Sequence, residues 1–144
     1  MKVASILKGK GADVTTVRPE ATIAAAAREL QAKGIGALVV SEDGRAVDGL
    51  LSERDIVNGL VFYGTRVGGL RVSDLMSRAV VTCAPDDSVT TVMEHMTRHR
   101  VRHVLVVEGR QLRGIVSIGD VVKHRLDELE TEASVLRDAF IARR

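Results

Sequence analysis

The sequence predicts an α/β (α+β) fold built from two copies of one small unit. A seven-residue motif occurs twice, as GLLSERD at 49–55 and as GIVSIGD at 114–120. Sliding the chain on itself aligns Pro19 with Pro85 (85 − 19 = 66), and after one deletion the two motifs follow at a shift of 65. Within each copy the apolar periodicities follow the same order, strand, helix, strand, strand, helix. The chain is therefore expected to be a tandem repeat.

The first helix of each copy begins after a hydroxyl residue and carries an apolar stripe with helical spacing. Thr22 and Ser88 are the expected N-caps. The two stripes are Ile23, Ala26, Ala27 and Leu30 in the first copy and Val89, Val92, Met93 and Met96 in the second. Gly34 predicts a left-handed C-cap for the first helix, whereas Arg100 at the matching position predicts that the second helix ends in another way.

Two short apolar runs follow each helix. They lie at 37–40 and 49–51 in the first copy and at 104–107 and 114–116 in the second, with turn residues between them at 41–45 and 108–110. We expect the first two strands of each copy to be parallel and the last two antiparallel. A mixed sheet of about three strands with two helices on one face cannot bury itself alone, so the two halves should pack on each other.

The repeat sets the expected domain boundaries: first repeat 1–62, linker 63–71, second repeat 72–126 and C-terminal helix extension 127–144. The segment at 72–76 mirrors 3–7 and predicts a short helix leading into each copy. After Asp120 the last helix continues with apolar residues at steps of 4, 3, 4, 3 and 4, namely Val122, Leu126, Leu129, Ala133, Leu136 and Phe140. This stripe is expected to pack against a second subunit or over the body of the molecule, and the dimer is the favoured reading.

Composition excludes several classes of protein. The hydrophobic content of 45% and charged content of 28% are ordinary for a folded globular domain. A net charge of +2 is too small to indicate a nucleic-acid partner, and three aromatic side chains offer little for base stacking. No apolar run approaches the roughly 18 residues of a membrane span. The single cysteine, Cys83, cannot form an intramolecular disulfide, which fits a reducing cytoplasm.

The repeated motif places a serine and an aspartate where a buried strand turns into a helix. A helix N-terminus leaves about four backbone N–H groups unpaired, so it can bind an anionic or polar ligand, and an aspartate one turn in can accept hydrogen bonds from hydroxyl groups. Serine followed three residues later by an acid is also a capping box, in which both side chains bond to the helix's own amides. Both interpretations remain open at this point, and the duplication favours the ligand.

These features resemble a pair of CBS domains, also called a Bateman module. The resemblance rests on the prolines at 19 and 85, on KGIGALVV at 33–40, on HRVRHVLVV at 99–107 and on the paired motifs, and it covers residues 1–126. It is strongest to stand-alone bacterial proteins of two CBS units. It implies a pseudo-symmetric body with two clefts, association of two chains into a flat disc, and regulatory binding of AMP, ADP or ATP. NAD-type cofactors or S-adenosylmethionine are ligands of some members, and no cofactor is required.

The resemblance also implies residue roles. Asp55 and Asp120 would accept from ribose hydroxyls, with Ser52 and Ser117 contacting ribose or phosphate. Adenine would lie against Val14, Thr15, Ile35 and Ala37 in one cleft and against Val80, Val81, Val101 and His103 in the other. Basic residues for phosphate are Arg102 and His103, with Arg54, Arg98, His99 and Arg100 as secondary candidates. Phosphates can cross from one cleft to residues of the other, so these basic residues are not assigned to one cleft. Asp120→Ala is expected to remove the larger part of the stabilisation by nucleotide.

Three other functions are alternatives to nucleotide binding. An enzyme is disfavoured, because the sequence has no phosphate loop, no G-x-S-x-G elbow and no HExxH motif. A metal site could use His95 and His99, which are four residues apart, but His103 falls in a predicted strand. An interaction dimer with empty clefts, acting on an effector protein that the sequence does not identify, would use the serines and aspartates only as caps.

Overall fold

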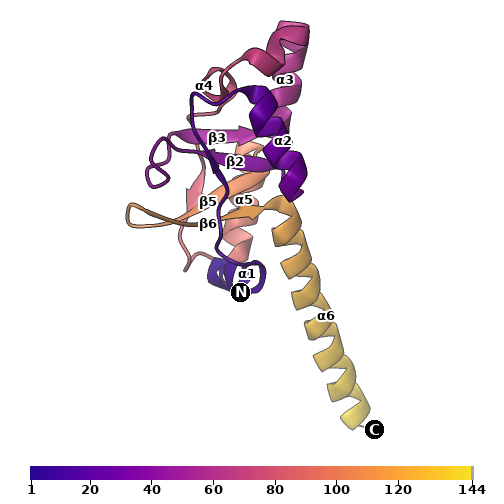
Figure 1. The fold of residues 1–144 in the computed structure, drawn as a ribbon. Helices are drawn as coiled ribbons and strands as arrows, with labels where there is room; N and C mark the ends of the chain where they lie inside the picture. Colours follow the sequence, from indigo (N-terminus) through magenta and orange to yellow (C-terminus); the bar gives the residue numbers. More distant parts are fainter. Residues whose placement is uncertain (144) are drawn as a thin grey trace.

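A computed structural model of the chain describes residues 1–143, which form two similar halves and a long C-terminal helix (Figure 1). The elements of the first half and the connection are α1 (Val3–Lys10), β1 (Thr16–Val17), α2 (Ile23–Lys33), β2 (Ala37–Val40), β3 (Gly49–Ser52), α3 (Glu53–Tyr63) and the 3-10 helix η1 (Gly64–Gly69). Those that follow are α4 (Val72–Leu75), β4 (Thr82–Cys83), α5 (Val89–His99), β5 (His103–Glu108), β6 (Gln111–Ser117) and α6 (Ile118–Ala142). The predicted order of strand, helix, strand, strand, helix is confirmed in both copies.

Each half contains one three-stranded mixed sheet, in the orders β1-β2-β3 and β4-β5-β6. The first two strands of each sheet are parallel and the last two antiparallel, as expected from the sequence. In the register of the antiparallel pairs, Ala37 lies opposite Ser52 and His103 lies opposite Ser117. The serine of each motif is therefore the last residue of an edge strand, and it lies beside the first residue of the central strand.

The first helices are capped as the sequence predicts, with one exception. Thr22 accepts from the amide of Ala25, and Ser88 accepts from the amide of Thr91. Gly34 ends α2 in the left-handed conformation (φ 61°). The expectation for α5 is wrong, because Arg100 adopts that same conformation (φ 53°, ψ 42°) despite its Cβ. A left-handed non-glycine residue is strained, so the following turn and strand β5 hold Arg100 in place.

The two lead-in helices are exchanged between the halves. Val3 and Ile6 of α1 are buried in the core of the second half, together with residues of α5, β5 and β6. Val72 of α4 is buried in the core of the first half. Both helices use their N-terminal amides in the same way: Ala4 N–H donates to the carbonyl of Pro85, and Ser73 N–H to that of Pro19. Each core is therefore completed by a helix that precedes the other copy in the sequence.

The first glycine of each motif makes room for this exchange. A Cβ at Gly49 would lie 2.6 Å from the carbonyl oxygen of Ser77, in the segment that follows α4. A Cβ at Gly114 would lie 2.7 Å from the side chain of Leu7 on α1. The duplicated glycine thus has a packing role, since it lets the exchanged segment approach the last strand closely.

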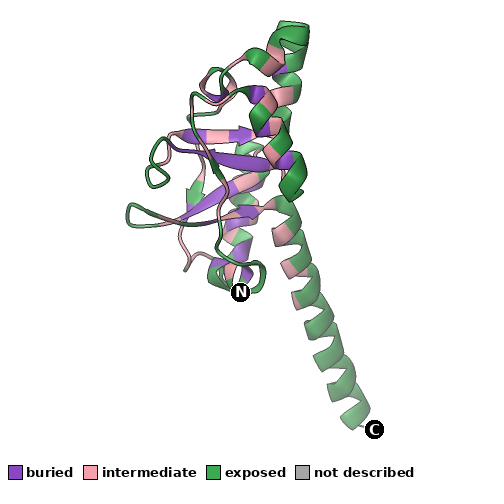
Figure 2. Ribbon diagram, viewed as in Figure 1, coloured by how far each residue is buried: buried purple, intermediate pink, exposed green. Residues whose placement is uncertain are grey.

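Helix α6 leaves the body and extends away from it, and Figure 1 shows its C-terminal end far from both sheets. Val121 is buried, whereas every residue from 129 to 143 is exposed, which Figure 2 shows as an unbroken green helix. From Leu129 onward, the alternative that the stripe packs over the body of its own chain is therefore wrong, although the earlier turns of α6 contact Met1 through His124 and Glu128. Within residues 1–143, none of the helices combines the length and the apolar character needed to cross a membrane.

Candidate functional site

Both serine–aspartate pairs form capping boxes at the start of α3 and α6. The Asp55 Oδ2 accepts from the amide of Ser52 at 2.8 Å, and the Ser52 hydroxyl accepts from the amide of Asp55 at 3.3 Å. The corresponding distances are 2.8 Å and 3.2 Å for Ser117 and Asp120. The capping interpretation of the motif is thus confirmed. Because each cap uses only Oδ2, it leaves Oδ1 of the carboxylate as an acceptor for another group.

A cavity of about 240 Å³ lies beside Asp55. This volume is a little below the roughly 300–1,000 Å³ of typical small-molecule sites. The lining combines the β3–α3 corner of the first half with the segments of the second half that precede β4 and β5. The lining residues are Gly36, Leu50, Ser52, Glu53, Arg54, Asp55, Ser77, Ala79, Val80, Val81, Arg100, Val101, Arg102 and His103. Ser77 and Ala79 were not predicted, because they reach the cavity through the segment that follows the exchanged helix α4.

The cavity has one apolar wall and one basic rim. Val80, Val81 and Val101 supply aliphatic surface from the second half. The rim carries Arg54, Arg100 and Arg102, all exposed, and within residues 1–143 none of the three guanidinium groups forms an ion pair. Guanidinium groups without carboxylate partners are suited to bind an anion such as phosphate. All three arginines were predicted from the sequence, and the structure brings them to the Asp55 corner.

The Asp120 corner is different, because a lysine occupies it. Lys10, the last residue of α1, donates to Asp120 Oδ2 at 2.7 Å and to the carbonyl oxygen of Ile115 at 2.9 Å. Burial alone would raise the pKa of the Asp120 carboxyl, but the hydrogen bonds from Lys10 and from the Ser117 amide hold this pKa below its usual value. Asp120 is therefore an ionised carboxylate that already has a cationic partner.

The lysine replaces a backbone bond of the other half. Leu50, which matches Ile115 at the shift of 65, exchanges two backbone hydrogen bonds with Ser77, each 2.9 Å long. In the second half α1 continues to Lys10, whereas α4 ends at Leu75, so the backbone after α1 does not pair with Ile115. The Lys10 ammonium group fills that position instead. No local sequence signal could reveal this contact, because 110 residues separate Lys10 from Asp120.

His103 lies between the two corners. A Cβ at Gly36 would come within 3.3 Å of its Nε2 atom, so the two halves are in close contact here. Burial is the main cause that lowers the pKa of His103, and the nearby charge of Lys10 lowers it further. Asp120 and Glu53 oppose this shift and Arg102 adds to it. The imidazole is thus neutral at pH 7 and can present one donor and one acceptor nitrogen to a ligand.

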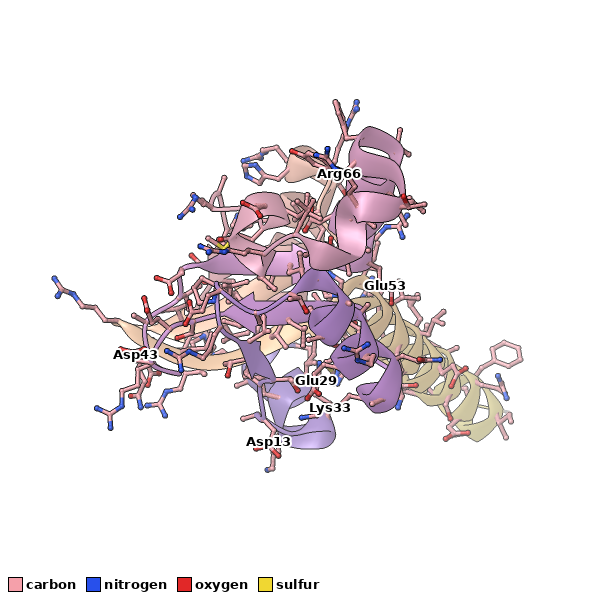
Figure 3. All side chains as sticks on the ribbon, turned by 45° about the horizontal axis from the view of Figure 1, so that its top comes forward. Asp13, Glu29, Lys33, Asp43, Glu53 and Arg66 are labelled. Atoms are coloured by element: carbon pink, nitrogen blue, oxygen red, sulfur yellow. The ribbon has the colours of Figure 1, made fainter. Side chains whose placement is uncertain are left out.

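The remaining predicted residues lie outside the Asp55 cavity. They are Val14, Thr15, Ile35, Ala37, Ser117 and Asp120, together with the secondary candidates Arg98 and His99 on α5. Ala37 is buried, and Thr15 Oγ1 accepts from Lys33 Nζ at 3.3 Å. Lys33 also pairs with Glu29 at 3.4 Å, and Figure 3 labels both side chains. The role of Val14, Thr15, Ile35 and Ala37 as a second adenine wall stays a prediction.

The histidines do not assemble into a metal site in the described part of the chain. His95 and His99 lie on α5 with ring centroids 6.3 Å apart in an edge-to-face arrangement, and His103 starts β5. Residues 1–143 contain no group of three or more histidine, cysteine, aspartate or glutamate side chains placed to hold a metal ion. No observation here favours the metal-binding alternative.

Comparison with known proteins gives a consistent result. A sequence model of the CBS domain matches residues 10–61 and 72–127. The chain is 33% identical to the CBS domain-containing protein YhcV of Bacillus subtilis over 123 residues, which cover 85% of this chain and 86% of YhcV. It is 32% identical to the mitochondrial CBS domain-containing protein CBSX3 of Arabidopsis thaliana over 140 residues, 93% of this chain and 68% of that protein.

Solved structures agree with these sequence matches. The CBS-domain containing protein ATU1752 from Agrobacterium tumefaciens is 43% identical and superposes with a TM-score of 0.84 over 86% of this chain and 92% of its own. The CBS domain pair of protein MJ0100, solved in complex with 5′-methylthioadenosine and S-adenosyl-L-methionine, is 23% identical, with a TM-score of 0.78 over 89% of this chain and 98% of its own. The latter likeness concerns the fold alone.

Proposed function

Since the chain belongs to the CBS-domain family, as a pair of CBS domains, we propose that it is a regulatory module that binds an adenosine-containing ligand in the Asp55 cavity. One observation carries this proposal: the cavity combines a carboxylate with an unused oxygen, an aliphatic wall and three unpaired arginines. A nucleotide has a matching set of parts, namely a vicinal diol, a flat base and phosphates.

The proposed pose follows from this chemistry. Asp55 Oδ1 accepts from a ribose hydroxyl, which forms a charge-assisted hydrogen bond. The base lies against Val80, Val81 and Val101, where its faces are removed from water. The phosphates extend to the basic rim. That MJ0100, a protein of the same fold, was solved with two adenosine compounds supports this ligand class.

We propose one ligand per chain. The Asp120 corner is the pseudo-symmetric counterpart, but Lys10 already pairs with its carboxylate at 2.7 Å. A ribose there would have to bind beside this ammonium group, which already neutralises the carboxylate. The sequence led us to expect that Asp120→Ala would remove most of the nucleotide binding. We now propose that Asp55→Ala does so instead, because the basic residues of the second copy line the cavity of Asp55.

A thermal-shift panel of AMP, ADP, ATP, NADH and S-adenosylmethionine tests the proposal. A ligand at about 100 times its dissociation constant stabilises the folded chain by about 2.7 kcal/mol. At about 2–4 °C per kcal/mol, the melting temperature would rise by several degrees. Arg102→Gln should weaken ATP more than adenosine, since it removes a phosphate partner only. If no member of the panel shifts the melt, the empty-cleft interaction protein becomes the better reading.

The module is proposed to act without catalysis, as a dimer, in the cytoplasm. Exposed apolar side chains gather on α3 and on the first turns of α6, and a second copy would cover them. They are Val57, Leu60, Val61, Phe62, Ile118 and Val122. A nucleotide regulates such an assembly only as far as it binds one arrangement better than another.

A further inference from the structure

We propose that residues 122–140 of α6 form a parallel two-stranded coiled coil with the same segment of a second copy of this chain. The inference rests on the proposed dimer and adds its orientation. It starts from the apolar stripe of α6. Val122, Leu126 and Leu129 are 47%, 55% and 43% exposed, and Leu136 and Phe140 are 71% and 62% exposed.

Between Val122 and Leu136, the exposed apolar side chains of the stripe are not buried by the body of their own chain. The helix projects from the module, as Figures 1 and 2 show, and its residues from 129 onward are all exposed. Helices in proteins owe most of their stability to the packing of an apolar face, and a solitary solvated helix of about 15 residues is marginal in water. The alternating steps of 4 and 3 give the period of 3.5 residues that lets two helices keep one seam in contact.

The charges beside the seam identify the partner as a second copy. With Leu126, Ala133 and Phe140 at heptad position a, the flanking g positions hold Arg125 and Glu132. The flanking e positions hold Glu130 and Arg137. In a parallel pair each g residue faces the e residue five positions later in the other helix. Arg125 then faces Glu130, and Glu132 faces Arg137, on both sides of the seam.

The antiparallel arrangement has the opposite outcome. One antiparallel register keeps all six apolar residues of the stripe in contact with apolar residues of the other helix. In that register, g positions face g positions and e positions face e positions. Glu132 would then face Glu132 of the other helix, Glu130 would face Glu130, and Arg137 would face Lys123. Like charges at these positions disfavour a pairing. The same sequence therefore attracts itself in one orientation and repels itself in the other.

A parallel coil constrains the rest of the assembly. Helix α6 begins at the Ser117–Asp120 corner, directly after strand β6. Both modules must then leave the coil at the same end, with their second repeats nearest to the partner. The Lys10–Asp120 contact, in the first turn of α6, lies at the base of this dimer helix.

Disulfide trapping in the full chain tests the orientation. Leu136 occupies a d position, which faces its own counterpart in a parallel coil, so Leu136→Cys should form a covalent dimer in a glutathione buffer. Val135→Cys is the matched control, because Val135 is 61% exposed but points away from the seam. Native Cys83 is buried, and burial raises the pKa of its thiol to about 11, so it should not react.

The expected result is a covalent dimer for most of the Leu136→Cys chain and for little of the Val135→Cys chain. Two results together would show an antiparallel coil and overturn the proposal. Leu129→Cys chains would cross-link with Ala133→Cys chains in a mixture, and Leu136→Cys would stay monomeric on oxidation. Equal slow cross-linking of Leu136→Cys and Val135→Cys would exclude any coil. In either case, a dimer seen by sedimentation would leave the proposed dimer and nucleotide site intact.

A charge exchange provides a second test without cysteine. Glu132→Lys should raise the dimer dissociation constant roughly 2–10-fold, because two attractive pairs become repulsive. Adding Arg137→Glu restores opposite charges in the parallel coil and should return the constant to its original value. If the double variant is no better than the single one, Glu132 and Arg137 do not face each other.

Discussion

Replacing Lys10 by methionine tests the asymmetry of the two corners. The substitution keeps most of the aliphatic side chain but removes the ammonium group that bonds Asp120 at 2.7 Å and Ile115 at 2.9 Å. The side chains of Lys10 and Asp120 are 33% and 23% exposed, so solvent screens the pair, and it contributes about 0.2–1 kcal/mol. The bond to the carbonyl contributes about 0.5–1.5 kcal/mol.

Together these losses should lower the free energy of unfolding by about 0.7–2.5 kcal/mol. At about 2–4 °C per kcal/mol, the melting temperature of the ligand-free protein should fall by about 1–10 °C. In return, the Asp120 carboxylate loses its cationic partner beside the predicted second adenine wall. We therefore expect isothermal titration calorimetry to find one nucleotide per wild-type chain and two per Lys10→Met chain.

Lys8→Met is the matched control, because Lys8 lies on the same helix and forms no ion pair within residues 1–143. It should leave both stability and stoichiometry unchanged. Two equivalents bound by the wild type would refute the reasoning. So would weaker binding of the single equivalent in Lys10→Met, since Lys10 would then be a phosphate ligand of the first site.

Two further variants test packing and charge. Gly49→Ala should cost more stability than Gly114→Ala, because its Cβ meets the backbone oxygen of Ser77 at 2.6 Å, whereas at Gly114 the flexible end of Leu7 can move. Chemical denaturation of both variants measures the difference, and equal costs would contradict the close approach at Gly49. The folded state lowers the pKa of His103. As the pH falls below about 6.5, His103 therefore binds a proton in the unfolded chain before it does so in the folded chain, and the free energy of unfolding decreases. His103→Gln should reduce the fall in melting temperature between pH 7.5 and 5.5, and an unchanged pH profile would mean that His103 is not buried as described.

Local patterns predicted the secondary structure and the sheets, because they depend on neighbouring residues. The spacing from Ile23 to Leu30 specifies a helix face, and the runs beginning at Ala37 and Gly49 specify two strands joined by a turn. The repeat then fixed the second half by analogy. The prediction for the end of α5 was wrong. A residue with a Cβ disfavours the left-handed conformation, but the packing of the turn after α5 outweighs this local preference at Arg100.

The site was predicted only in part, because it depends on contacts between distant segments. The apolar face of Val3 and Ile6 shows that α1 is buried but not in which core, so the exchange of lead-in helices could not be foreseen. Because of the way the halves pack, Arg102 lies with Asp55 rather than with the aspartate of its own repeat. Lys10 carries no local signal at all, and its contact decides which corner is open.

The central claim is that Asp55 binds the ligand while Asp120 acts as a cap paired with a lysine. Asp55→Ala and Asp120→Ala each remove one capping box, which should destabilise the chain by about 0.5–2 kcal/mol. Asp120→Ala also removes the Lys10 ion pair, which contributes about a further 0.2–1 kcal/mol. Calorimetric titration of both folded variants, with the nucleotide that most stabilises the wild type, should find binding lost in Asp55→Ala and retained in Asp120→Ala. A folded Asp55→Ala chain that binds this nucleotide as tightly as the wild type would contradict the account.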